Sequence, residues 1–290
     1  VTHEYLDRIA DRLVPTPTTG ALATRLTEGL GDDAAKASAL ADYVRREISY
    51  KSIAFGPRGY VPESPDEVLR ARFGDCKGLS ALFRQLMLAA GVPCELALVH
   101  TDDLCWGEVP DRWQFNHMIN WCPSLGGGRF IDCVDRGLSA RTVAPNGLAG
   151  RGALILAREQ PHLREIATYP PDANRVRITR EVRVGADDDL RIEDSLSIDG
   201  NLASYMRRWL QRHEGQALRQ QMQDLLHRHD PRIDLVDLAT IDISNFAEPC
   251  RLRMRYRVRG AIETIDGRRL ARLVAPWERD YLLPTRVHSR

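Results

Sequence analysis

Two helix-start signals in succession, around residues 64–76, constrain this chain more than any other feature of its sequence. Ser64-Pro65-Asp66-Glu67 has the order of a helix start: a serine N-cap, a proline at the first helical position and a glutamate that completes a capping box. The short helix that it opens ends near Gly74, and Asp75 is a second N-cap. Apolar residues then recur three and four apart up to the stop at Gly91-Val92-Pro93, namely Leu79, Leu82, Phe83, Leu86 and Met87. The sequence therefore predicts a buried helix whose first turn contains Cys76.

The position of Cys76 matters for its chemistry. The first turn of a helix carries free N–H groups and the positive end of the helix dipole, and both favour an anion. A cysteine placed there can have its pKa lowered from about 8.5 into the range of roughly 3.5 to 7.5, and the thiolate is the nucleophile. The structural alternative is that Cys76 is a small residue buried at the start of a core helix, because free cysteine is among the most buried residue types.

A candidate base and a candidate acid follow in the sequence. Residues 115–121 alternate like a strand that carries His117, Gly126-Gly127-Gly128 supplies a turn, and residues 129–134 read as the return strand of a hairpin. We therefore expect His117 and Asp132 to face each other from neighbouring strands. In a triad the imidazole takes the thiol proton or stabilises the thiolate, and the carboxylate orients the ring.

Each of these residues also has a structural explanation. His117 could be a hydrogen-bonded core histidine, and Asp132 or its neighbour Asp135 could cap a turn. A helix-start cysteine followed by a histidine strand and an aspartate strand nevertheless favours a catalytic site built from Cys76, His117 and Asp132.

The motifs resemble those of the bacterial transglutaminase-like family over roughly residues 35–157. That superfamily shares a papain-like core with a Cys-His-Asp triad, so the resemblance implies Cys76 as nucleophile, His117 as base and Asp132 as the orienting acid. The matching residues are Tyr50, Gly59-Tyr60-Val61-Pro62, Pro65, Val68-Leu69, Gly74-Asp75-Cys76-Lys77, Gly91-Val92-Pro93, Phe115-Asn116-His117 and Ile131-Asp132.

One departure narrows what the resemblance implies. Lys77 follows the nucleophile, where the protein-crosslinking transglutaminases usually have an aromatic residue. We therefore expect a cysteine-dependent acyl-transfer enzyme that attacks amide or thioester bonds through a thioester intermediate. A water acceptor makes it a protease or amidase and an amine acceptor a transglutaminase; the expected partners are a peptide or protein amide and, for transfer, an amine, with no cofactor. The alternative from another class is a catalytically inactive peptide-binding or scaffolding module of the same fold.

Further residues are candidates for contacts with the substrate. Tyr50 or Tyr60 could donate a hydrogen bond to the oxyanion beside the N–H of Cys76, although local packing explains both. Trp106 and Trp113 lie in or beside a long loop before the His117 strand, where binding walls often form, and each could equally be a hydrophobic plug.

Composition excludes other classes of function. Lys plus Arg exceeds Asp plus Glu by 41 − 40 = 1, so no overall field points to nucleic acid, and no apolar run is long enough to span a bilayer. Cys105, Cys122 and Cys133 lie near His117 and Asp132 without metal-ligand spacing, so we expect no metal. We favour a cytoplasmic location, with a periplasmic one if an export signal has been removed. The sequence does not define the oligomeric state.

Pro161, Pro170 and Pro171 mark a boundary. We expect residues 1–160 to form a catalytic domain with a papain/transglutaminase-like core, in which the nucleophile helix packs on an antiparallel sheet. Residues 172–290 predict a smaller accessory α+β domain that is rich in β-strands, with strands near 176–184, 190–198, 233–243 and 252–262 around one long helix at 202–229. The predicted fold class of the chain is α+β.

Overall fold

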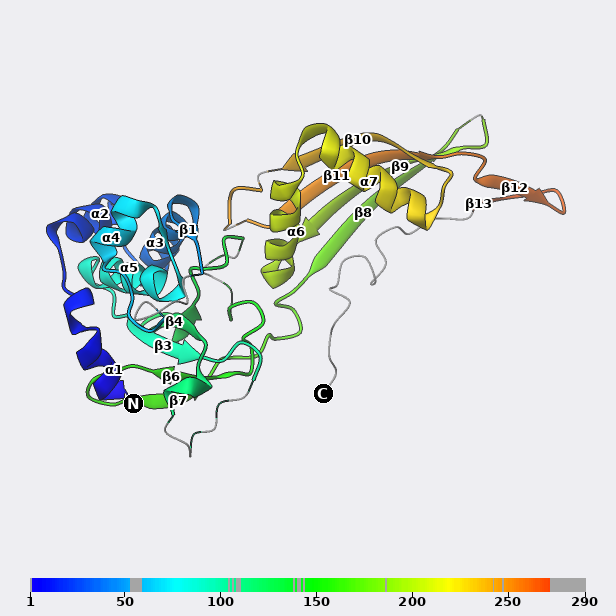
Figure 1. The fold of residues 1–290 in the computed structure, drawn as a ribbon. Coiled ribbons are helices and arrows are strands. Elements are labelled where there is room, and N and C mark those ends of the chain that lie inside the picture. Colours follow the sequence, from blue (N-terminus) through cyan, green and yellow to red (C-terminus); the bar gives the residue numbers. More distant parts are fainter. Residues whose placement is uncertain are drawn as a thin grey trace. The chain divides into compact units, whose positions relative to one another are not determined.

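The chain forms two compact units, Val1–Ala173 and Asn174–Arg290 (Figure 1). The computed structural model describes residues 2–52, 59–103, 105, 107, 111–137, 139, 142, 144–185, 187–241, 243–246 and 248–271. The mixture of helices and antiparallel sheets confirms the predicted α+β class. Within these residues, no helix has the length and apolar character needed to cross a bilayer.

Local sequence signals set the helices of the first unit. These are α1 (Thr2–Arg8), the 3₁₀ turn η1 (Ala10–Arg12), α2 (Pro17–Thr27), α3 (Asp33–Glu47), α4 (Pro65–Ala71) and α5 (Cys76–Ala89). The predicted capping box at the start of α4 is present: the Ser64 hydroxyl accepts from the Glu67 N–H, and the Glu67 carboxylate accepts from the Ser64 N–H at 2.8 Å. Asp32 caps α3 and Asp75 caps α5, each with a side-chain carboxylate that accepts from N–H groups of the first turn.

Helix α5 is the core helix that the apolar spacing predicts. Leu79, Leu82, Phe83, Leu86 and Met87 are all buried, and they pack with apolar residues of α2 and α3. Removing each such side chain from water stabilises the fold by about 1.5–3 kcal/mol. The helix is thus held firmly along its length, and its N-terminal residue has a fixed position.

A five-stranded antiparallel sheet lies against this helix group. Its order is β5-β4-β3-β6-β7, and its strands are β3 (Glu95–Val99), β4 (His117–Cys122), β5 (Arg129–Ile131), β6 (Gly152–Ile155) and β7 (His162–Glu165). Two hydrogen bonds join α5 to β4: the Ser80 hydroxyl donates to the Met118 carbonyl, and the Asn120 amide donates to the Ser80 carbonyl, each at 3.0 Å. These bonds hold the helix that carries Cys76 against the strand that begins at His117.

The turn between β4 and β5 requires glycine. Gly128 has a φ of +106°, and a Cβ placed there would lie 2.0 Å from the ring of Trp121. No other residue fits this position without moving the indole, so the predicted triple-glycine turn is confirmed as the connection between the two strands.

The second unit is a four-stranded antiparallel sheet of order β10-β11-β9-β8, with two helices across one face (Figure 1). Its elements are β8 (Val176–Val184), β9 (Leu190–Ile198), α6 (Gly200–Arg212), α7 (Gly215–His229), β10 (Ile233–Ile241), β11 (Cys250–Val258) and the hairpin of β12 (Ile262–Ile265) and β13 (Arg268–Ala271). A fully buried carboxylate, Asp194, accepts from Arg180 twice at 2.7 Å and from the Tyr256 hydroxyl at 2.8 Å. These hydrogen bonds compensate the buried negative charge of Asp194, which would otherwise be costly to bury.

The single long helix predicted at 202–229 is wrong, because the chain forms α6 and α7 instead. His213 and Glu214 both adopt extended backbone angles, and Gly215 follows with a φ of +54°. A left-handed glycine between two extended residues and a new helix breaks the i to i−4 ladder. The break lets Leu210 on one helix and Leu226 on the other reach the same core.

Candidate active site

Cys76 is the first residue of α5 and is half-buried. The chain reaches it through Arg72, which ends α4 in the left-handed conformation, and through the short strand β2 (Phe73–Gly74). Strand β2 pairs in parallel with β1 (Ser49–Tyr50), and the N–H of Lys51 donates to the Gly74 carbonyl at 2.9 Å. These backbone bonds fix the two residues that lead into the N-cap, so the sulfur stands at a defined place at the helix end.

Asp75 organises the first turn of α5. Its carboxylate accepts from the N–H groups of Lys77 and Gly78, at 2.9 and 3.0 Å. The ammonium group of Lys77 pairs with the second oxygen of the same carboxylate, and both side chains are buried. The lysine therefore balances a negative charge that would otherwise lie uncompensated beside the Cys76 sulfur.

His117 and Asp132 are directly bonded. The imidazole Nε2 lies 2.8 Å from a carboxylate oxygen of Asp132, and both side chains are 11% exposed. The other carboxylate oxygen accepts from the Val134 N–H at 2.8 Å, which holds the carboxylate in place. The Cys76 side chain lies close enough to the ring to be one of the causes that raise the pKa of His117. Because Nε2 faces Asp132, Nδ1 is the ring nitrogen left for the sulfur.

The electrostatics of this pair favour a charged imidazole. Burial disfavours the imidazolium, yet the Asp132 carboxylate and the Cys76 sulfur together raise the pKa of His117 to about 10. For Asp132, burial opposes ionisation, but the charge and hydrogen bond of His117 outweigh it and lower the pKa of the carboxyl below its usual range. At neutral pH the arrangement is thus an imidazolium held between a carboxylate and a sulfur.

Arg45 of α3 binds the main chain of Asp132. It is 1% exposed, and its guanidinium donates to the Asp132 main-chain carbonyl at 2.7 Å. In return, Arg136 donates to the main-chain carbonyls of Arg45 and Arg46 at 2.7 and 2.9 Å. The positive charge of Arg45 also contributes to the lowered pKa of Asp132. These hydrogen bonds therefore fix the position of residues 132–136 relative to helix α3.

Of the other residues that the sequence suggests as substrate contacts, the structure describes Tyr50, Tyr60 and Trp113. Tyr50 lies near enough to Cys76 that, after burial, the sulfur is the next cause of the raised pKa of its phenol. Tyr60 and Trp113 pack edge to face with ring centroids 5.2 Å apart, and Trp113 is 64% exposed. Trp106 lies outside the described residues.

Sequence reasoning missed two residues beside the site, and the first is Tyr5 of α1. Its phenol donates to the Tyr60 carbonyl at 2.7 Å, and burial, Cys76 and Asp75, in that order, raise its pKa. The helical spacing of Tyr5 and its apolar neighbours predicts only a packing role for this residue. A contact with a residue more than 50 positions away leaves no local signal in the sequence. Arg45 escaped notice for the same reason.

Three other thiols near the site are buried, and His100 is hydrogen-bonded within its own loop. Cys94 and Cys122 are buried with their sulfurs 3.7 Å apart, and burial raises the pKa of Cys133 to about 12. His100 caps its own loop by accepting from the Asp103 N–H at 2.7 Å. In the part of the chain that the structure describes, no three His, Cys, Asp or Glu side chains gather as a metal site would need.

Comparison with known proteins points to one family. The model of the transglutaminase-like superfamily matches residues 20–123, a span that includes Cys76 and His117 and ends before Asp132. No curated protein matches the chain.

Two solved structures are similar to it. A "putative protease" from Parabacteroides distasonis aligns at 12% identity and a TM-score of 0.46, over 88% of this chain and 52% of that protein. A "putative cysteine protease" from Cytophaga hutchinsonii aligns at 17% identity and a TM-score of 0.33, over 44% of this chain and 42% of that protein. This chain thus spans about half the length of each protein or less.

These similarities to solved structures are too remote to carry an argument about activity, whereas the family match covers both the helix that begins at Cys76 and the strand that begins at His117. Residues 20–123 of this chain form a domain that matches the transglutaminase-like superfamily.

Proposed function

We propose that this chain is a cysteine-dependent acyl-transfer enzyme in which Cys76 is the nucleophile, His117 the acid and base, and Asp132 the residue that orients His117. One observation carries the proposal: an imidazole bonded to a buried carboxylate at 2.8 Å lies close enough to a half-buried cysteine at a helix N-terminus for the cysteine to raise its pKa. Nucleophile, base and orienting acid within hydrogen-bond reach of one another are the signature of an activated thiol.

The first half of the reaction follows from these positions. The Cys76 thiolate attacks the carbonyl carbon of an amide or thioester, and the carbonyl oxygen becomes an oxyanion. His117, which is protonated at neutral pH, gives its proton to the leaving amine as the carbon–nitrogen bond breaks. The acyl group then remains on the sulfur of Cys76 as a thioester.

The second half returns the enzyme to its starting state. Neutral His117 takes a proton from water or from an acceptor amine, which attacks the thioester carbonyl and releases Cys76 as a thiolate. Water as acceptor gives a protease or amidase, and an amine gives a transglutaminase. The substrate class is a peptide or protein amide in both cases.

We assign one main-chain donor to the oxyanion. Asp75 uses the N–H groups of Lys77 and Gly78, and the N–H of Leu79 donates to the Asp75 carbonyl at 2.9 Å. This leaves the N–H of Cys76 itself as the first-turn donor that can face the reacting carbonyl. The Tyr5 hydroxyl already donates to Tyr60, so we assign it no such role.

The test is the pH dependence of iodoacetamide labelling, read residue by residue with mass spectrometry in the native chain and in His117→Ala. We expect fast labelling of Cys76 near pH ~6 that is lost in the variant. Cys105 is a control thiol within the same chain, because it is partly exposed and burial raises its pKa. It should label only at higher pH and equally in both proteins.

If Cys76 labels only near pH ~8.5 and His117→Ala changes nothing, the proposed chemistry is wrong. In that case a catalytically inactive peptide-binding module becomes the better explanation of the fold.

A further inference from the structure

Two buried thiols face each other across the sheet of the first unit. Cys94 comes just before β3, and Cys122 is the last residue of β4. Glu95 pairs with Trp121 in the antiparallel register, so the residues one position further out, Cys94 and Cys122, lie opposite each other. Their sulfurs are 3.7 Å apart. The two cysteines are therefore direct cross-strand neighbours whose side chains point at one another.

The backbone at this position has the spacing that a disulfide needs. Residues directly opposite each other in an antiparallel pair have Cα atoms about 4.5–5.5 Å apart. Disulfides span Cα separations of about 4.4–6.8 Å, and their sulfurs are about 2.05 Å apart. The sulfurs of Cys94 and Cys122 must approach by about 1.7 Å, which small rotations of the two side chains can supply while the strands stay in place.

Apolar side chains enclose this pair. Cys94 and Cys122 are at most 1% exposed, and they belong to the same apolar cluster as Leu125, Ile131 and a third thiol, Cys133. Burial, and then the nearby Cys122, raise the pKa of the Cys94 thiol well above its usual value. Because the thiolate is the reactive form, an oxidant can reach and react with these sulfurs only while the chain folds or opens locally.

We infer that Cys94 and Cys122 are a disulfide site, which closes when the chain folds in the presence of a small disulfide such as oxidised glutathione. One cysteine attacks the small disulfide and releases a first thiol, and the second cysteine attacks the mixed disulfide and releases the other. Two S–H groups of the protein thus become one S–S bond, and oxidised glutathione is reduced to two molecules of glutathione.

The bond joins the two ends of the segment that carries the candidate base. Residues 94 to 122 include β3 and the start of β4 at His117, so the disulfide closes a loop around both strands. Such a cross-link removes conformational freedom from the unfolded chain and stabilises the folded one. Cys76 packs against a different apolar cluster, so it remains a free thiol when this pair is oxidised.

The test is peptide mapping by mass spectrometry without reduction, after the full chain has been treated with a mixture of reduced and oxidised glutathione. In one treatment the chain is refolded from urea, and in the other the native chain is held in urea below its unfolding midpoint. We expect a linked pair of peptides that contain Cys94 and Cys122 in both folded products. Cys76 and Cys105 are partly exposed and can take up glutathione, so the readout is the linked pair and not the loss of thiols.

Cys122→Ala and Cys133→Ala are matched variants, because each removes a buried thiol from the same apolar cluster. In the oxidised native chain and in Cys133→Ala, the disulfide should raise the melting temperature by roughly 5–10 °C over that of the same protein with a reducing agent. In Cys122→Ala the reducing agent should change the melting temperature by less than about 2 °C, since no cross-link can form.

Three results would overturn the inference. The first is that Cys94 and Cys122 remain thiols after both treatments, and the second is that Cys94 is found linked to Cys133 or to glutathione instead. The third is a melting temperature of the oxidised native chain that does not depend on the reducing agent. None of these results depends on the reactivity of Cys76, so they count against the disulfide and leave the proposed chemistry untouched.

Discussion

Replacing Asp132 with asparagine should lower the pKa of His117 towards neutral pH. Burial alone disfavours the imidazolium, and the charge and hydrogen bond of Asp132 are the largest of the opposing causes that raise the pKa of His117 to about 10. Asparagine keeps the size and a polar contact with the ring but carries no charge. Because Cys76 still favours the charged ring, we expect a fall of at least two pKa units, or about 3 kcal/mol of interaction with the imidazolium.

The assay is a pH titration of the imidazole nitrogens by NMR in uniformly ¹⁵N-labelled protein. The chain has eight histidines, and the resonance of His117 is the one that disappears in His117→Gln. Asp135→Asn is the matched control: this buried aspartate lies three residues further on and bonds to the Gly137 N–H at 3.0 Å. It should leave the His117 titration in place.

A single outcome would refute the reasoning. If His117 in Asp132→Asn titrates within about half a unit of its native pKa, the carboxylate is not what holds the proton. The charged imidazole would then depend on Cys76, and Asp132 would act only through the position of the ring.

Three further predictions concern stability, measured by urea unfolding. Because folding raises the pKa of His117, its stabilising effect is complete below about pH 6.5 and is lost as the pH rises towards 10, so the native chain should lose stability across that window more steeply than His117→Gln. Arg45→Met removes the donor to the Asp132 carbonyl, so it should lower the free energy of unfolding by about 1.5–3 kcal/mol and slow the labelling of Cys76. An unchanged labelling rate would show that Arg45 does not position Asp132. Phe83→Ala, at a side chain with no exposed area, should cost about 3–5 kcal/mol without moving the pH of labelling, and a cost below 1 kcal/mol would contradict the core packing.

Local chemistry explains which parts of the fold the sequence predicts. The starts of α4 and α5 depend on caps within four residues of Ser64 and Asp75, and the β4–β5 turn depends on the conformation of Gly128. These signals act over a few residues, so they can be read without knowing the rest of the structure. The bond between His117 and Asp132 follows once two such strands are paired, because the hairpin connection is short.

Long-range contacts explain what the sequence does not predict. Arg45 reaches Asp132 across 87 positions, and an arginine in an amphipathic helix is ordinarily a surface residue. The break between α6 and α7 had a local signal in Gly215, but an isolated glycine in a helical pattern is tolerated often enough that the pattern outweighed it. The charge state of His117 depends on burial and on two partners at once, and neither is visible in the spacing of residues.

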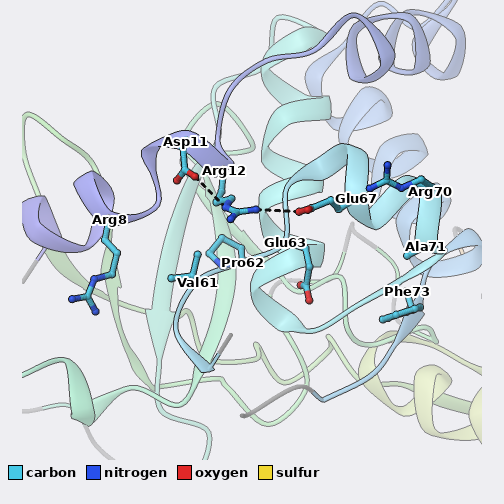
Figure 2. Close-up of a pocket in the computed structure, with 10 residues that line it drawn as sticks. All are labelled: Arg8, Asp11, Arg12, Val61, Pro62, Glu63, Glu67, Arg70, Ala71 and Phe73. Atoms are coloured by element: carbon cyan, nitrogen blue, oxygen red, sulfur yellow. Dashed lines mark hydrogen bonds and ion pairs between the residues drawn. The ribbon is translucent and has the colours of Figure 1, made fainter. Parts of the chain in front are cut away.

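The family match covers only part of the first unit. Cys76 and His117 lie inside residues 20–123, whereas Tyr5 and Arg12 precede that span. Arg12 reaches into the matched domain through Glu67 (Figure 2), and Tyr5 does so through the Tyr60 carbonyl. The candidate triad is therefore not contained in the matched region alone, because Asp132 follows its last residue, and Tyr5, whose pKa responds to Cys76, precedes its first.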